Sequence, residues 1–447
     1  MGRGIWKLNT SLLTDQMYLN LVKQILKEEK LKYALPVYNL NFIESSDSNE
    51  TIQFLIDDDI FLEMVYLRVR GESIKFASIK KKNTHLQEKT LKRDIELLEL
   101  NPVQNHQIID DKKQELEKLR DYKLKGHLVR ARLQWLNEGE KPTNFFCNLE
   151  KRNFTEKTMR KLKLDNGSII TDQKLILDSV RNFYAHLFDE KKNSECSQND
   201  LNNLVKGEKL NMVNQINLGD DLSTNELTKA LKQMKNNKTP GLDGIPAEFL
   251  KVFWADLKFF VTRALNVCYK KGKLSYSLRQ SIITCLPKGE KDRQLLKNWR
   301  PISLLCTTYK LASTVISNRL KPPLHKIVSK TQSGFLSGRN IAESTRLIYD
   351  IMHYTEAKTI NGILLLIDFE KAFDSLSWDF LYTVLSYFGF DEALIKWIKL
   401  FNNDIEARVC QAGFLSDPIK IKRGCRQGDP ISCYEFILAA EILALLT

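Results

Sequence analysis

Apolar residues at helical spacing dominate the first part of the chain. In residues 12–30 they recur every three or four positions, and Thr14 or Asp15 stands where a helix N-cap is expected. Residues 54–82 repeat the pattern and predict one long helix or two shorter ones. The N-terminal 150 residues are therefore expected to be mostly helical.

Two further amphipathic segments, 86–100 and 108–136, flank the breaker "NPVQNHQ". A break between two amphipathic helices predicts an antiparallel helical hairpin. Its dense lysine and arginine side chains suit contact with phosphates. They suit equally well a solvated face that is balanced by its own glutamates and aspartates.

Turn signals and short helices are predicted in the middle of the chain. Asn166–Gly167 is a two-residue turn signal and predicts a β-hairpin over 163–172. The polar, aperiodic stretch 189–203 predicts a loop. Two helix starts come next: a capping box of Ser223 or Thr224 with Glu226, and Pro246 in the first turn of a second helix.

The pattern changes near Ile282, where short β-like runs begin to alternate with helices. Residues 281–287 and 362–368 each predict a strand, and the second of them, "GILLLID", ends in Asp368. The chain is therefore predicted to be of the α+β class, with a mostly helical N-terminal region and a mixed second half.

The composition indicates a polyanionic partner. The chain has 447 residues, a formal net charge of +13 and a pI near 9.1, which favours nucleic acid, with an acidic membrane surface as the weaker alternative. No apolar stretch of the sequence approaches the ~18 residues of a spanning helix. The eight cysteines form no C-x-x-C pair, so reduced thiols in an intracellular protein fit better than a zinc site or disulfides.

Cations and small residues of the second half suggest ligand contacts. A strand, a basic loop and a return strand place Lys288 and Arg300 in one region, and two cations on a hairpin suit a triphosphate. Taken alone, surface cations are more often structural. The stretch "KTQSGFLSGRN" holds Gln332, Gly334 and Arg339, a combination that lets a nucleic-acid strand approach closely.

Asp368 stands at the carboxyl end of a predicted buried strand. A buried carboxylate must be paired, solvated or bound to a cation, and Mg²⁺ prefers one or two carboxylates together with substrate phosphates. The alternative is an aspartate that caps the next helix. Phe373 follows five residues later and is a bulky ring suited to lie against a sugar.

The stretch "KRGCRQGDPIS" predicts a loop that opens a helix. Gln427 offers an amide, Gly428 permits close approach of a ligand, and Asp429 can cap the helix with Pro430 in its first turn. The helix itself has an apolar stripe between residues 431 and 445 that needs cover on one side.

Together these stretches resemble one family, the reverse transcriptases of non-LTR (LINE-type) retrotransposons. The motifs "KTPGLDGIPAEF", "LPKG…NWRPISLL", "TQSGFLSGRN", "LLLIDFEKAFDS" and "RGCRQGDPIS" occur in the family's order and spacing. Upstream, "WKLNTSLL" and residues 135–153 are similar to the family's segment between endonuclease and polymerase. The resemblance thus covers nearly the whole chain.

The resemblance implies a right-hand polymerase, with fingers over roughly 240–350 and an incomplete palm from about 360. It implies three parts: a helical linker region at 1–150, a connecting region at 151–240 and a reverse transcriptase domain at 241–447. The implied partners are an RNA template, a DNA primer and deoxynucleotide triphosphates, with no membrane, in the cytoplasm and nucleus.

The resemblance also implies a role for each site residue. Asp368 would be the first catalytic aspartate and a ligand of Mg²⁺, with the carbonyl of Phe369 as an added ligand. Phe373 would be the steric gate for the sugar. The remaining implied contacts are Lys288, Arg300, Gln427 and Gly428 to the nucleotide, and Gln332, Gly334 and Arg339 to nucleic acid.

The sequence departs from the family in one respect. The family's Ala-Asp-Asp hairpin, which supplies two further metal ligands, is not found in it, and the sequence opens on the segment that follows the endonuclease in the family. One aspartate cannot hold a two-metal centre. We therefore expect a truncated fragment that is inactive alone and leaves its last helix and the strand of Asp368 uncovered. The alternative is a catalytically dead RNA- or DNA-binding remnant of a retroelement.

Overall fold

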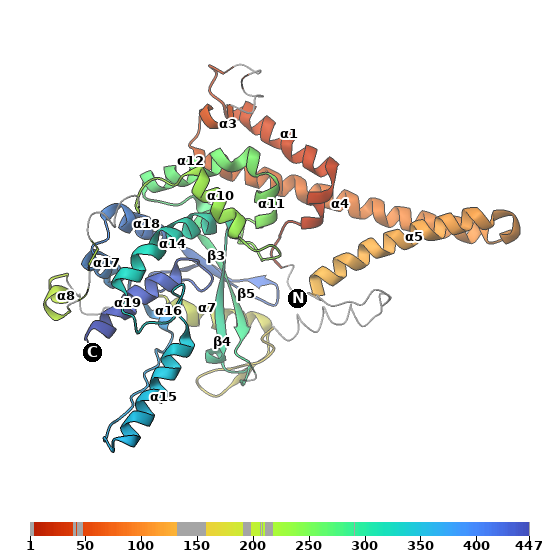
Figure 1. The fold of residues 1–447 in the computed structure, drawn as a ribbon. Helices are drawn as coiled ribbons and strands as arrows, with labels where there is room; N and C mark the ends of the chain where they lie inside the picture. The colour runs from red at the N-terminus through yellow and green to blue at the C-terminus, as the bar shows by residue number, and fades with distance from the viewer. Residues whose placement is uncertain are drawn as a thin grey trace.

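The computed structural model describes residues 4–38, 42, 48–131, 158–190, 198–205, 207, 209–210, 218–289 and 291–446. They form a helix-rich body around a five-stranded sheet, and two helical projections extend from it (Figure 1). The architecture therefore mixes α and β elements. Within the described ranges, no helix is both long enough and apolar enough to cross a membrane.

The N-terminal region is helical, as predicted. Its elements are η1 (Thr10–Thr14), α1 (Gln16–Tyr33), α3 (Ser48–Thr51), α4 (Asp58–Leu98) and α5 (Pro102–Ala131). Asp15 is the N-cap of α1, because its carboxylate accepts a hydrogen bond from the Met17 N–H at 3.0 Å. Segments 54–82 and 86–100, predicted separately, share the single 41-residue helix α4.

Helices α4 and α5 form the predicted hairpin, which projects from the body as a long arm (Figure 1). Leu91, Ile95 and Leu116 pack together between the two helices. Beside this small core, Lys112 forms an ion pair with Asp94 at 2.8 Å. At this position an acid of the arm neutralises a lysine of the arm, in line with the alternative that its basic side chains form a solvated face and do not contact phosphates.

The middle of the chain contains short elements. They are β1 (Leu162–Lys163), β2 (Ile169–Ile170), α7 (Gln173–Leu187), α8 (Gln198–Leu204), α10 (Thr224–Gln233), α11 (Ala247–Val252), α12 (Trp254–Lys271) and α13 (Tyr276–Arg279). The predicted hairpin is confirmed as the antiparallel pair β1–β2, and Ser223 forms the predicted capping box with Glu226. Pro246 is the N-cap of α11 and stands one position before the helix.

The predicted loop over 189–203 is wrong at its C-terminal end, where α8 lies. Leu201 and Val205 are buried in the main core. Tertiary burial of these two side chains stabilises a helix that the polar composition of the stretch conceals. Residues 135–153, which carry part of the family resemblance, lie outside the described residues.

The five-stranded sheet runs β4–β3–β5–β6, with β7 also paired to β5. Its strands are β3 (Gln280–Pro287), β4 (Trp299–Leu305), β5 (Glu406–Gln411), β6 (Phe414–Leu415) and β7 (Ile419–Lys420), and η2 (Leu296–Asn298) lies in the loop before β4. Strands β3 and β4 are antiparallel, with Leu286 opposite Arg300, whereas β3 and β5 are parallel. The strand predicted over 281–287 is confirmed.

Helices surround this sheet in the second half of the chain. They are α14 (Thr307–Ile327), α15 (Ile341–Ala357), α16 (Ala372–Ser375), α17 (Trp378–Tyr387), α18 (Glu392–Asn402) and α19 (Ser432–Leu446). Helix α15 is the second projection of Figure 1.

The strand predicted over 362–368 is wrong, because this stretch has no regular secondary structure. Its apolar side chains are exposed, Ile363 by 97% and Leu366 by 76%. A strand needs a paired neighbour to satisfy its backbone groups, and β propensity alone does not supply one. The described residues place no such neighbour beside it.

The stripe of α19, expected to be uncovered, is instead part of the main hydrophobic core. Ile431, Ile437 and Leu438 are each only 1% exposed. Helix α17 packs against α19 and helps to cover the stripe. Among the elements of the second half, the 363–367 segment and α15 carry uncovered apolar side chains, whereas on α19 only Leu443 and Leu446, near its end, are exposed.

The start of the chain is tied to its second half. The Trp6 ring lies against Gly244, where a Cβ atom would come within 2.2 Å of the ring and φ is +74°. The Leu8 N–H also donates to the Gly244 carbonyl at 3.0 Å. The two motifs "WKLNTSLL" and "KTPGLDGIPAEF" thus contact each other, and one core extends from Leu8 to Ile442. The three predicted domain boundaries stay a prediction.

Candidate functional site

The loop that precedes α19 joins two distant segments. The Cys425 N–H donates to the Phe373 carbonyl at 2.6 Å, and the Ser303 N–H of β4 donates to the Gln427 carbonyl at 2.8 Å. Gly428 is needed at this contact, since its φ is +114° and a Cβ atom would lie 2.8 Å from the Ser303 carbonyl oxygen. The loop therefore fixes Phe373 and Gln427 beside the sheet.

Asp374 is the polar centre of this junction. Its side chain is 5% exposed, and the Gln427 side-chain amide donates to it at 3.5 Å. Burial raises the pKa of Asp374 to about 6, although the Gln427 hydrogen bond and the positive charges of Lys371 and Lys288 oppose the rise. The structure thus places Lys288 and Gln427 near a buried carboxylate that was expected only to order a turn, with Gly428 next to Gln427 against β4. The contacts of these residues with a nucleotide stay predictions.

Lys288 and Arg300 lie on the hairpin formed by β3 and β4. Lys288 follows directly after β3, and its ammonium group donates to the Lys297 carbonyl at 2.8 Å. Arg300 lies opposite Leu286 in the antiparallel register and is exposed. Neither cation is held by a carboxylate within ion-pair distance in the part of the chain that the structure describes. Both are available to an anionic ligand.

Aromatic rings support one side of the junction. Phe373 stacks on Phe436 of α19, with ring centroids 4.9 Å apart, and Phe335 meets the Phe373 ring edge-on at 6.3 Å. Phe369 meets Phe436 edge-on at 5.8 Å. Phe335 comes from the "TQSGFLSGRN" loop, so that loop lies against the predicted sugar-contacting ring. Phe335 and Phe436 were not predicted as site residues.

Gln332, Gly334 and Arg339 shape this loop from within. The Gln332 side-chain oxygen accepts from the Gly334 N–H at 2.9 Å. The Arg339 guanidinium donates to the carbonyls of Gln332 at 2.7 Å and Val328 at 3.1 Å, beyond the end of α14. These bonds give all three residues a structural role, and their contact with nucleic acid stays a prediction.

Asp368 lies in the exposed stretch that was predicted to be a strand. It does not cap the following helix, because the N-cap of α16 is Lys371. Among the described residues, no group of three histidine, cysteine, aspartate or glutamate side chains is placed to hold a metal ion. The roles of Asp368 and Phe369 as metal ligands stay predictions.

A buried polar network anchors the loop before α19 to α14. Asp429 accepts hydrogen bonds from the Tyr309 hydroxyl at 2.5 Å and from the Ser313 hydroxyl, and it lies 3.3 Å from the Arg426 guanidinium. Its contact with the Ile431 N–H, at 3.4 Å, is the predicted cap, but α19 begins only at Ser432, and Pro430 precedes it. The sequence holds no local signal for the α14 partners, which lie more than a hundred residues upstream.

Glu435 of α19 lies close to the same network. Its side chain is 5% exposed, and burial together with the negative charge of Asp429 raises its pKa to about 7. The Cys425 thiol and the Arg426 charge oppose this rise. Glu435 was not predicted as a functional residue.

Comparisons with known proteins agree on one family. Residues 286–445 match the family model described as reverse transcriptase (RNA-dependent DNA polymerase). The chain is 33% identical over 334 residues to the transposon TX1 uncharacterized 149 kDa protein of Xenopus laevis, a match that covers 74% of this chain and 25% of the relative.

Two further relatives come from insect retrotransposable elements. The Pol polyprotein of the type-1 element R1 of Bradysia coprophila is 25% identical over 237 residues, 51% of this chain and 23% of its own length. The Pol polyprotein of the type-2 element R2DM of Drosophila melanogaster is 23% identical over 207 residues, 46% of this chain and 19% of its own. The matches thus span a quarter or less of each relative. Residues 286–445, which begin at the end of β3 and contain β4 and the Asp374 junction, are a reverse transcriptase domain, and the chain belongs to the non-LTR retrotransposon family.

Proposed function

We propose that this chain supplies the nucleotide-handling part of a polymerase that copies retrotransposon RNA into DNA. One observation carries the proposal: the loop before α19 joins β4 to the Phe373–Asp374 segment and so gathers the predicted nucleotide contacts in one place. The hairpin of β3 and β4 would then belong to the fingers, and α16 to α19 to the palm.

Each residue of the junction suits one part of a deoxynucleotide. Lys288 and Arg300 are exposed enough to neutralise a triphosphate, for which charge-assisted hydrogen bonds are the strongest contacts. The Phe373 ring, held by Phe436, offers a flat face against which a 2′-hydroxyl would clash, which would favour deoxyribose. Gln427 supplies an amide, and Gly428 leaves room for a close approach of the ligand.

The family generally uses divalent metal ions, which neutralise the triphosphate when they are bound. Asp368 is the residue that we propose to hold Mg²⁺. The described residues do not fit a complete site, since Asp368 is exposed and is not grouped there with two further acids. We therefore propose that bond formation requires acids beyond those of the Asp374 junction.

The proposed partners are an RNA template, a DNA primer and deoxynucleotide triphosphates, in the cytoplasm and nucleus. Template contact is assigned to the loop of Gln332, Gly334 and Arg339, because Phe335 of this loop lies against Phe373. A second candidate function is a catalytically dead nucleic-acid-binding protein. The exposed position of Asp368 favours this alternative.

Primer extension tests the proposal. The purified chain is mixed with poly(A)–oligo(dT), dTTP and Mg²⁺ or Mn²⁺, and both retention of the primer–template and incorporation are measured. We expect retention without incorporation. Robust incorporation that Asp368→Ala abolishes would show that the chain completes the metal site itself. A chain that retains no primer–template would contradict both candidate functions.

A further inference from the structure

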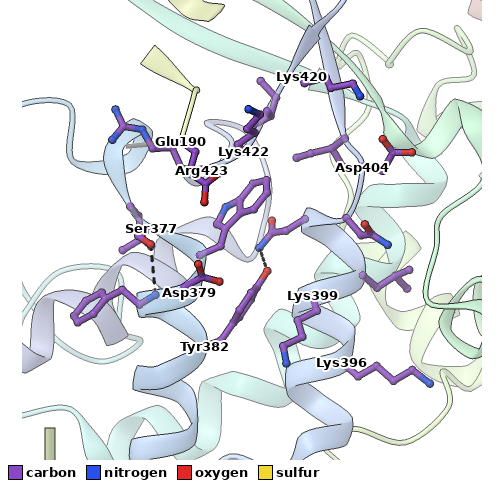
Figure 2. Close-up of a pocket in the computed structure, with 18 of the residues that line it drawn as sticks. Glu190, Ser377, Asp379, Tyr382, Lys396, Lys399, Asp404, Lys420, Lys422 and Arg423 are labelled. Carbon is purple, nitrogen blue, oxygen red and sulfur yellow. Dashed lines mark hydrogen bonds between the residues drawn. The ribbon is translucent and has the colours of Figure 1, made fainter. Parts of the chain in front are cut away.

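A cavity of about 1420 Å³ lies beside the candidate nucleotide site. It is lined by the start of α17, by the C-terminal part of α18 and by residues 420–423 (Figure 2). Ser375 and Arg423 belong to its wall. In sequence, Ser375 directly follows Asp374 of the junction, and Arg423 precedes the loop residue Gly424. Its volume exceeds the ~300–1,000 Å³ of a small-molecule pocket, so an extended ligand fits better.

Lysine side chains border this cavity on two sides. Lys420 and Lys422 lie along one wall, and Lys396 and Lys399 of α18 lie along the other (Figure 2). All four side chains are exposed. Within the described parts of the chain, Lys396, Lys399 and Lys420 have no carboxylate at ion-pair distance. Lys396 lies over the Tyr269 ring at 4.4 Å and Lys399 over the Tyr382 ring at 5.4 Å, contacts that do not neutralise their charge. The three charges can therefore still attract an anionic ligand.

One acid of the cavity wall is already neutralised from outside the cavity. Asp404 pairs with Lys273 at 2.9 Å and also with Arg279. The hydrogen bond from Lys273 is the main cause of the lowered pKa of Asp404, and the charges of Arg279 and Lys420 add to it. Lys422 is likewise paired from outside the cavity, with Asp189 at 2.9 Å. The acids Glu190 and Asp379 then remain, against Lys396, Lys399, Lys420 and Arg423 in the lining. The cavity therefore favours a polyanion.

Two aromatic side chains, Trp378 and Tyr382, line the same cavity as the lysines. The Trp378 indole N–H donates to the Gly424 carbonyl at 3.0 Å, which fixes the ring, and the Tyr382 hydroxyl accepts from the Asn402 amide at 3.3 Å. Both side chains are only partly buried. Fixed rings combined with cations in one groove are the arrangement that binds single-stranded nucleic acid, with bases stacked and phosphates neutralised.

We propose that this cavity binds a single strand of RNA or DNA, with its phosphates on Lys396, Lys399 and Lys420 and its bases against Trp378 and Tyr382. The inference goes beyond the proposed function, because the strand binds without a primer or a nucleotide. The contacts are to phosphates and ring faces, so the sequence of the strand is not read.

The test compares two matched double variants by fluorescence anisotropy with a labelled oligouridylate, without primer or dNTP. Lys396→Glu with Lys399→Glu reverses two cavity charges on α18. The control, Lys229→Glu with Lys232→Glu, makes the same change of net charge at the same spacing on the exposed face of α10. Thermal unfolding of both proteins checks that they fold.

The cavity variant should bind the strand at least tenfold more weakly than the control. Its salt slope should fall by about 1.4, since each lost single-strand phosphate contact contributes about 0.7. An oligothymidylate should behave in the same way, and a blunt duplex should be affected no more than in the control. Equal losses in both variants, or an equal loss for the duplex, would overturn the proposal. Primer–template retention in the cavity variant would then leave the proposed function standing.

Discussion

Burial governs how the acids around the site ionise. Asp374 and Glu435 are both buried, and burial raises their pKa values to about 6 and about 7. A carboxyl group with a raised pKa binds its proton more tightly in the folded state than in the unfolded state. The stability that it contributes is complete below the unfolded pKa, near 4, and is lost as the pH rises through the folded value.

Glu435→Gln is predicted to remove the loss of stability that accompanies ionisation of Glu435 at high pH. The amide keeps the shape of the protonated acid and never ionises, so the variant and the parent chain should unfold at similar temperatures near pH 5. Near pH 8 the variant should be more stable, by up to about 3 kcal/mol at about 1.4 kcal/mol per pKa unit. Glu392→Gln, on the exposed face of α18, is the control. A stability difference that is the same at both pH values would contradict the prediction.

At the scale of elements, the sequence predicted those that depend on neighbouring residues better than those that depend on contacts between distant segments. The α1 cap at Asp15, the capping box at Ser223 and the turn of the β1–β2 hairpin each depend on residues within a few positions of one another. The strand predicted over 362–368 failed, because a strand also needs a neighbour from elsewhere. Gln427, which belongs to a sequence motif, lies at the candidate site. The role of Tyr309 in anchoring the loop has no local sequence signal, because its partner Asp429 is distant in sequence.

The outer part of the arm, formed by α5 and the C-terminal part of α4, is predicted to unfold independently of the body, whereas Phe61 to Val69 of α4 belong to the main core. Its small core of Leu91, Ile95 and Leu116 is separate from the main core. Leu116→Ala should cost about 2–5 kcal/mol within the arm, so limited proteolysis should cut the arm faster while the body stays intact. Leu86→Ala, at a position 61% exposed, should leave the cleavage rate unchanged. Loss of the whole protein to the protease in Leu116→Ala would show that the arm and the body unfold together.

At the scale of the whole molecule, the described surface carries uncovered apolar side chains on the 363–367 segment and on α15. Leu365 is 75% exposed and Tyr349 is 65% exposed. Patches of this kind favour association, and an apolar segment with unpaired backbone groups can template pairing with another chain. We therefore expect the purified chain to self-associate and to be poorly soluble.

Leu365→Lys should reduce this association, because a charge in the segment makes its burial against another chain costly. Light scattering across a concentration series measures the effect. The control is Val103→Lys, at a position 93% exposed on the arm, which should not change the average mass. A parent chain that stays monomeric throughout the series would contradict the expectation.

Template-directed retention of a nucleotide tests the central claim most directly. Labelled dTTP and dGTP are each added to the chain on poly(A)–oligo(dT) with Mg²⁺, and the retained label is counted for the parent chain, for Arg300→Gln and for Lys291→Gln as the control. We predict that dTTP is retained over dGTP, and that only Arg300→Gln weakens this retention, by about tenfold or more for the loss of a charge-assisted contact worth ~1.5–3 kcal/mol. Equal retention of the two nucleotides, or equal behaviour of the two variants, would contradict the assignment of this junction as the nucleotide site of a reverse transcriptase.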